Sequence, residues 1–179
     1  MPKNHAVMIS TSMVSWDVDA NRICGIYKDA DVDNGVLVTL DTMNVDGQNA
    51  IQGYEYNVKL ATNNSTSCWI VDTPLPGVSI ESQIMSDPRY FTNEAGRPLS
   101  LRYLNAHVDH IEVDANAFAE GNAPADQPTY RFVSVGANGK LSIAQNAPGA
   151  GTYFALVGQK TIGIGQDTVP TYVLRCERN

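Results

Sequence analysis

Three aspartates at alternate positions, Asp29, Asp31 and Asp33, are the first residues whose types and spacing could do chemistry. Their spacing matches the first three ligand positions of an EF-hand calcium loop. The sixth loop position is Asn34 instead of glycine, and the twelfth is Leu40 instead of a bidentate glutamate. Because this ligand set is incomplete, we interpret the stretch as a solvated turn that starts a core strand, and we predict no metal site.

A second candidate cluster contains His107, Asp109 and His110. On a strand, His107 and Asp109 share one face and His110 points to the other. A zinc site needs three or four convergent ligands, and the sequence has no second His/Cys pair to supply them. The favoured interpretation is a polar strand start in a strand over 107–113. A small β-fold hydrolase that uses His107 and Asp109 remains an alternative.

The other motifs of enzyme chemistry are missing from the sequence. It contains no Gly-x-Ser-x-Gly nucleophile motif and no phosphate-binding loop with its lysine. Cys24, Cys68 and Cys176 are an odd number of widely spaced cysteines. They fit neither a disulfide framework nor a zinc site, and they favour synthesis in a reducing compartment. We therefore predict a non-enzymatic protein with no catalytic residues and no cofactor.

The composition limits the kinds of partner that the chain is expected to bind. The 179 residues are 43% hydrophobic and 17% charged, and the formal net charge is −7. This is enough apolar material for one domain with a core. The acidic balance argues against binding to nucleic acid, whose phosphates require clustered Lys and Arg, and against anionic membranes. No apolar run is long enough to span a bilayer, and the first 16 residues lack the apolar core of a secretory signal.

The elements that must position these residues are short strands. Apolar runs of four to eight residues recur with turn signals roughly every 8–12 residues, which predicts an all-β fold, either an antiparallel β-sandwich or a β-barrel. Asn34-Gly35 predicts a tight turn with positive φ. Asp114 is a candidate N-cap for one or two helical turns over 114–120, and 80–90 is helix-like or irregular. The strands are expected at 22–27, 36–40, 54–60, 68–71, 99–104, 107–113, 130–135, 140–144, 152–160 and 168–176.

Residues 1–20 have no clean period and are rich in Ser, Thr and Met. We interpret them as an extended N-terminal arm on a single β-rich domain over 21–179. The alternative is that the segment contributes a first edge strand. As an arm, it would bind a partner through its apolar side chains, which are Val7, Met8, Ile9, Met13, Val14 and Trp16.

Several segments between about residues 30 and 135 resemble the head-decoration, or cement, proteins of tailed bacteriophages. They are the Asn-Gly turn before Val36-Leu-Val38, Trp69-Ile-Val-Asp-Thr-Pro74, Tyr90-Phe-Thr-Asn-Glu-Ala-Gly-Arg-Pro98, and the Ala-Phe-rich turn after Ile111-Glu-Val113. The resemblance implies a virion protein on the capsid surface, synthesised in the cytoplasm of a bacterial host. Its partner would be the major capsid protein, and self-association is left open.

A third function class remains open beside the decoration protein and the hydrolase. A carbohydrate- or receptor-binding β-domain, from a phage fibre or a cell-surface protein, would present an exposed aromatic platform. Trp69 and the tyrosines spread through the strands are the residues to inspect.

Overall fold

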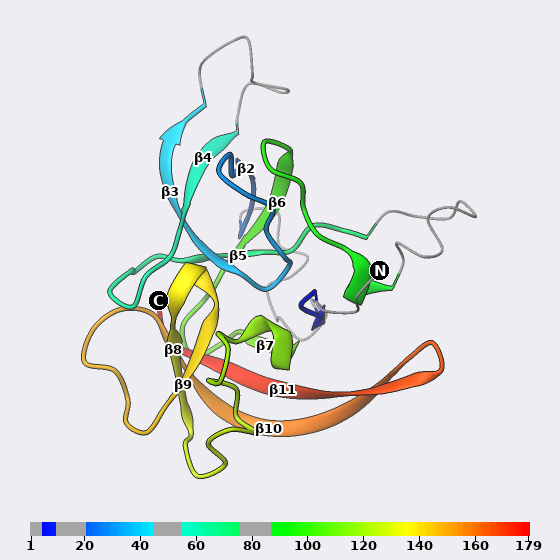
Figure 1. Ribbon diagram of the computed structural model, residues 1–179. Helices are drawn as coiled ribbons and strands as arrows, with labels where there is room; N and C mark the ends of the chain where they lie inside the picture. Colours follow the sequence, from blue (N-terminus) through cyan, green and yellow to red (C-terminus); the bar gives the residue numbers. More distant parts are fainter. Residues whose placement is uncertain (1–4, 10–20, 45–54, 76–86) are drawn as a thin grey trace.

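The computed structural model describes residues 5–9, 21–44, 55–75 and 87–179. These residues form β-strands joined by turns and single 3-10 turns, and they build a closed barrel and a six-stranded sheet (Figure 1). The prediction of an all-β fold is therefore confirmed, with one barrel and one open sheet in the same chain. No helix in the described ranges is long and apolar enough to cross a membrane.

The barrel occupies the upper part of Figure 1. Its strands follow the order β2–β4–β3–β5–β6, and β6 closes on β2. The β2–β4 pair is parallel and the other pairs are antiparallel. The strands are β2 (Arg22–Ile26), β3 (Leu37–Met43), β4 (Tyr56–Leu60), β5 (Trp69–Val71) and β6 (Pro98–Tyr103).

The sheet lies below the barrel, in the order β1–β7–β11–β10–β8–β9. All of its pairs are antiparallel. Its two longest strands, β10 and β11, form a hairpin that extends well past their neighbours. The strands are β1 (Met8–Ile9), β7 (His110–Asp114), β8 (Phe132–Val135), β9 (Leu141–Ala144), β10 (Tyr153–Ile164) and β11 (Asp167–Arg178).

β3 and the residue before it, Val36, lie between the two hydrophobic cores and contribute side chains to both. Val36 and Val38 pack inside the barrel, whereas Leu37, whose side chain alternates to the opposite face, packs with the core of the sheet. β5 repeats the pattern, with Val71 in the barrel core and Ile70 in the sheet core. The sequence of a strand that is buried on both faces consists of consecutive apolar residues. This explains why Val36-Leu37-Val38 does not alternate with polar residues.

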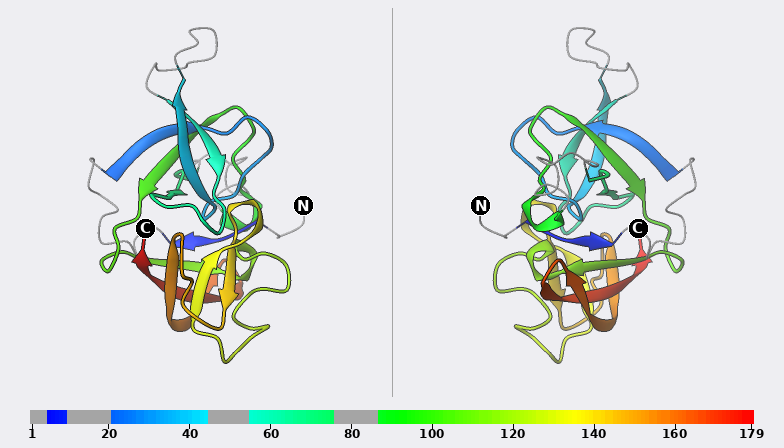
Figure 2. Two further views of the ribbon diagram at one scale, coloured as in Figure 1. Left: turned by 90° about the vertical axis from the view of Figure 1, so that its left-hand side faces the viewer. Right: turned by 90° about the vertical axis from the view of Figure 1, so that its right-hand side faces the viewer.

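Further contacts hold the barrel against the sheet. The turn between β8 and β9 packs on β3 so closely that a Cβ at Gly139 would lie 2.3 Å from the Leu37 carbonyl oxygen. At the end of β11, the Asn179 side chain accepts a hydrogen bond from the Cys68 amide (2.7 Å) and donates one to the Leu104 carbonyl (2.8 Å). Figure 2 shows the barrel stacked on the six-stranded sheet.

The 3-10 turns are η3 (Pro88–Tyr90), η4 (Ala115–Ala117) and η5 (Ala137–Gly139). Asp114 caps η4 by accepting a hydrogen bond from the Asn116 amide, as the N-cap prediction requires. Of the segment expected to be helix-like or irregular, 80–86 lies outside the described residues and the remainder contains η3.

Each predicted strand range overlaps a strand of the structure, but β3 and β10 end later than predicted and one predicted strand starts too early. The strand predicted over 107–113 begins only at His110. His107 has φ of 65°, a left-handed conformation that no strand residue adopts. Asp109 accepts a hydrogen bond from the Asn105 amide at 2.8 Å, so 105–109 forms a turn instead.

Candidate functional site

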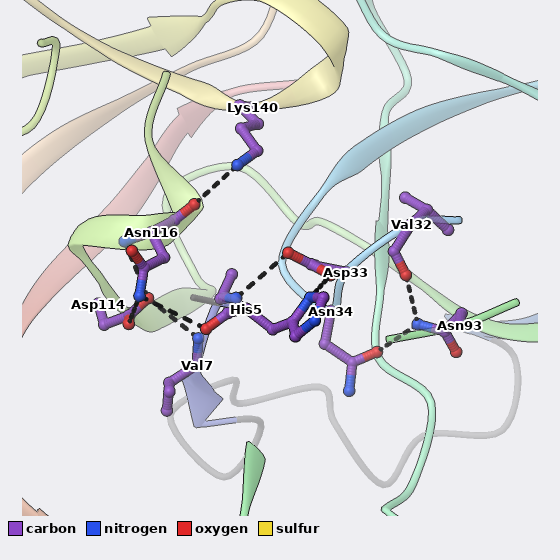
Figure 3. Close-up of polar contacts among 10 residues, drawn as sticks. His5, Val7, Val32, Asp33, Asn34, Asn93, Asp114, Asn116 and Lys140 are labelled. Carbon is purple, nitrogen blue, oxygen red and sulfur yellow. Dashed lines mark hydrogen bonds and ion pairs between the residues drawn. The ribbon is translucent and has the colours of Figure 1, made fainter. Parts of the chain in front are cut away.

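A cluster of polar contacts lies where the N-terminal segment passes between the barrel and the sheet (Figure 3). Val7 is 0% exposed, and Met8 and Ile9 are half-buried in β1, opposite Val113 and Glu112. Residues 5–9 therefore belong to the folded body, and β1 is the edge strand of the sheet.

Two carboxylates from distant parts of the chain hold this segment. Asp33 accepts hydrogen bonds from His5 Nδ1 (2.8 Å) and from the Ala6 amide (3.3 Å). Asp114 accepts one from the Val7 amide through its side chain (3.0 Å), while its own amide donates to the Val7 carbonyl (3.0 Å). We call residues 5–9 with Asp33 and Asp114 the N-terminal clasp, because it ties the segment to both the barrel and the sheet.

Asp114 carries an electrostatic cost in this position. Burial removes water from its carboxylate and raises its pKa above the ordinary value, although hydrogen bonds from Val7 and from Asn116 act in the opposite direction. The Asn116 side chain also donates to Asp114 at 2.9 Å. Each oxygen of this buried carboxylate thus has a donor, as a buried acceptor requires.

The acidic turn is the other half of the clasp. Gly35 has φ of 87°, which confirms the predicted tight turn at Asn34-Gly35. The Asn34 side chain donates to the Thr73 carbonyl (2.8 Å) and accepts from the Thr73 amide (3.1 Å). The turn is therefore fixed against the chain that leaves β5, and Asp33 is held in place to meet His5.

The three aspartates of the turn do not converge on one point. Asp29 is exposed, Asp31 accepts a hydrogen bond from the Ala95 amide (2.9 Å), and Asp33 is used by the clasp. Among the described residues no group of three His, Cys, Asp or Glu side chains could hold a metal ion. Asp31 and Asp33 instead bind backbone amides of other segments.

A groove of about 500 Å³ opens beside the clasp, and His5, Tyr27, Asp31, Asp33 and Lys140 contribute to its lining. A His–Asp pair can act as a general base when the aspartate orients the imidazole. In this groove, however, the polar groups already serve the fold: Asp33 holds the N-terminal segment, and Lys140 Nζ donates to the Asn116 carbonyl at 3.1 Å. The arrangement is suited to fastening the chain.

The alternative acid–base pair is separated in the structure. The His107 side chain is 74% exposed and lies 3.4 Å from Glu177 Oε2, whereas Asp109 is buried and receives both donors of Asn105. The two residues thus have different partners. The structure gives no support to the predicted common face, because 107–109 is not a strand.

The cysteines are free thiols. Burial, followed by the nearby charges of Asp109 and Glu177, raises the pKa of Cys176 to about 12. Burial also raises the pKa of Cys68 and of Cys24. Thiols with raised pKa values are weak nucleophiles at neutral pH, because the thiolate is the reactive form.

The aromatic side chains are used for packing. Trp69 and Tyr103 lie on neighbouring strands with their ring centroids 5.2 Å apart, edge to face, and Trp69 packs against the barrel core. Among the described residues each Trp, Tyr and Phe side chain is at least half-buried. The exposed platform expected of a carbohydrate-binding domain is therefore not found in the described ranges.

The β10–β11 ribbon, by which we mean the hairpin over 157–170, is longer than the strands that the sequence predicted at 152–160 and 168–176. Ile164 pairs with Asp167 across a two-residue turn in which Gly165 has φ of 62°. The buried guanidinium of Arg89 braces this end by donating to Asp167 (2.7 Å) and to the Ile164 carbonyl (3.3 Å). The run Ile162-Gly-Ile-Gly165 was the available signal, since a glycine at a hairpin turn permits positive φ.

The six residues predicted to bind a partner differ in burial and in whether the structure describes them. Val7 is enclosed by the protein itself, and Met8 and Ile9 are half-buried. Met13, Val14 and Trp16 lie outside the described residues. The exposed large apolar side chains of the described ranges are Met43, Val108 and Val157.

Comparison with known proteins adds no identity. No family model, curated protein or solved structure matches the chain.

Proposed function

We propose that this protein is a non-enzymatic virion component that binds the outer surface of the major capsid shell and stabilises it. The polar residues that could do chemistry form hydrogen bonds that hold segments of the fold together. The interaction element is instead a β-ribbon that leaves the body of the molecule (Figure 1).

The ribbon is the observation that carries this proposal. Gln159, Lys160 and Thr161 are exposed along it, and its end is braced by Arg89. Val157, which is 56% exposed, adds apolar surface at the root. A braced ribbon loses little conformational entropy on binding, so it suits a protein that bridges neighbouring subunits.

In this mechanism each copy makes a modest contact through the ribbon, and many copies on one shell add their contacts. Multivalent attachment strengthens overall binding without any new type of contact. Binding to the assembled shell stabilises it against dissociation, since a ligand that prefers the assembled state shifts the equilibrium toward it. The predicted arm contacts of Met13, Val14 and Trp16 would add to the same surface.

The test uses capsids assembled without this protein from the major capsid protein encoded in the same genome. Adding the purified chain is expected to give co-sedimentation with the capsids and a higher capsid melting temperature. A chain that neither co-sediments nor changes the melting temperature overturns the proposed function.

Two variants locate the contact. Replacing 161–170 with Asn-Gly shortens the ribbon but keeps Lys160 and Thr171, which both contact Glu112. This variant is expected to bind capsids at least tenfold more weakly. In the second variant, Met13, Val14 and Trp16 become serine, which leaves the clasp intact where deletion of 1–16 would remove it. If only the second variant loses binding, the contact lies in the arm and the ribbon is excluded.

A further inference from the structure

One edge of the ribbon is open along the outer half of β10. β8 pairs with β10 only at Tyr153–Ala155, and the last bond on that side runs from the Leu156 amide to the Arg131 carbonyl. From Gly158 to Ile164, β10 pairs with β11 alone among the strands of the described ranges.

Pro170 determines which backbone groups face outward. It lies opposite Thr161 and has no N–H, so this pair cannot be one that exchanges hydrogen bonds between β10 and β11. The N–H and C=O of Thr161 therefore point away from β11. Because the pattern alternates along an antiparallel strand, the same groups of Gln159 and Gly163 also point outward.

The two edges of the ribbon differ as a consequence. On β11 the outward positions of the ribbon are Thr168 and Pro170, and the proline offers no donor. On β10 the outward positions are Gln159, Thr161 and Gly163, and each has both a donor and an acceptor. Only the β10 edge presents a continuous row of backbone groups that another strand could pair with.

We propose that the β10 edge pairs with the same edge of a second copy of this chain, antiparallel about a two-fold axis at Thr161. This interaction does not depend on capsid binding. In this register Thr161 faces Thr161, and Gln159 faces Gly163 of the other copy on both sides of the axis. Pairing outward positions with outward positions gives about six backbone hydrogen bonds.

Charge selects this register over the adjacent one. With the axis at Thr161, Lys160 lies opposite Ile162 of the second copy, and no two like charges face each other. Moving the axis to Lys160 would put the two Lys160 side chains directly opposite one another, which is unfavourable. The cross-strand Thr–Thr contact at the axis is itself a favourable pair.

The contact is short, so the dimer is expected to be weak in isolation and concentration-dependent. Copies arranged at high local concentration would be joined far more effectively. The edge interaction is therefore suited to linking neighbouring copies that are already held near each other.

The test measures the mass of the purified chain by sedimentation equilibrium at concentrations up to about 1 mM. The average mass is expected to rise from 19.4 kDa toward twice that value. Thr161→Pro removes an outward N–H that the chain's own hairpin does not use, and it should leave the protein monomeric. Thr168→Pro, the matched control on the β11 edge, should dimerise like the wild type.

The register has its own test at Ile162. Ile162→Glu places a carboxylate opposite Lys160 of the other copy twice, and should tighten the dimer by about two- to thirtyfold. Ile162→Lys should weaken it by a similar factor. Equal effects of the two variants would exclude the register centred on Thr161.

Two results overturn the proposal. One is a wild-type chain that stays monomeric across the whole concentration range. The other is a Thr161→Pro variant that dimerises like the wild type, since the dimer would then form without the β10 edge. If the wild-type chain is monomeric and Thr161→Pro loses capsid binding, the edge receives a strand of a different protein.

Discussion

A substitution at Val7 can distinguish whether the N-terminal segment is part of the core or a docking segment for a partner. The sequence placed it in an arm that binds a partner, but the structure encloses its side chain and bonds its amide and its carbonyl to Asp114. Val7→Ala keeps these backbone bonds and removes only apolar contacts. If the segment is part of the core, the substitution destabilises the isolated chain.

The expected loss follows from the two carbons removed. Each buried methyl or methylene group contributes about 0.8 kcal/mol, and the incompletely filled cavity adds to this, so Val7→Ala should cost about 2–3 kcal/mol. For a chain of this length, 1 kcal/mol shifts the melting temperature by about 2–4 °C. The variant should therefore melt about 4–12 °C below the wild type.

The assay is urea and thermal unfolding of the purified chain without any partner. Met8→Ala is the matched control, because Met8 is adjacent but only half-buried, and it should cost about half as much as Val7→Ala. Wild-type stability in Val7→Ala, combined with weaker capsid binding, would refute the assignment of Val7 to the core and restore its role as a docking residue.

Two further predictions concern the clasp and the contact between the barrel and the sheet. The folded-state pKa of Asp114 is raised above 3.8. At pH values between the unfolded-state pKa and the folded-state pKa, the folded state therefore binds more protons than the unfolded state. Its contribution to stability is therefore fully present below the unfolded pKa and is lost as pH rises through the folded one. Urea unfolding at several pH values should show wild-type stability falling relative to Asp114→Asn as pH rises from about 4; a constant difference would contradict this. Gly139→Ala should cost about 2–4 kcal/mol, because φ is +69° and the new Cβ would meet the Leu37 carbonyl. Gly165→Ala, at φ of +62° with no atom within 4 Å, should cost only about 1 kcal/mol, and equal losses would refute the close contact with Leu37.

The parts of the fold that the sequence predicted are those controlled by local chemistry. The β-branched and aromatic runs marked the strands because they fit a pleated, half-buried surface. Asn34-Gly35 marked its turn because glycine adopts positive φ without strain, and Asp114 marked a helical turn because its side chain can accept from an amide two residues later.

The parts that the sequence could not predict depend on distant partners. Asp33 meets His5 across 28 positions, and Asp114 meets the Val7 amide across 107. No local pattern encodes such pairs, so the sequence predicted a solvated turn at these aspartates and gave no sign of a bond to the N-terminal segment. The strand predicted at His107 failed for a related reason, since the Asn105–Asp109 hydrogen bonds compete with strand pairing.

The carboxylates of the acidic turn and the backbone groups of the ribbon differ in how far the described part of the chain already uses them. The carboxylates of Asp31, Asp33 and Asp114 each accept from a backbone amide of another segment, which leaves them fewer lone pairs for a ligand. A row of outward backbone groups on a long exposed strand is, by contrast, a template for pairing that proteins normally block with proline, charge or a covering element. In the ribbon the β11 edge carries such a block at Pro170, whereas the β10 edge has no proline and its one charged side chain, Lys160, is paired with Glu112 at 3.3 Å. This asymmetry favours a β10 edge used for pairing, since an edge without a partner would gain from the same block.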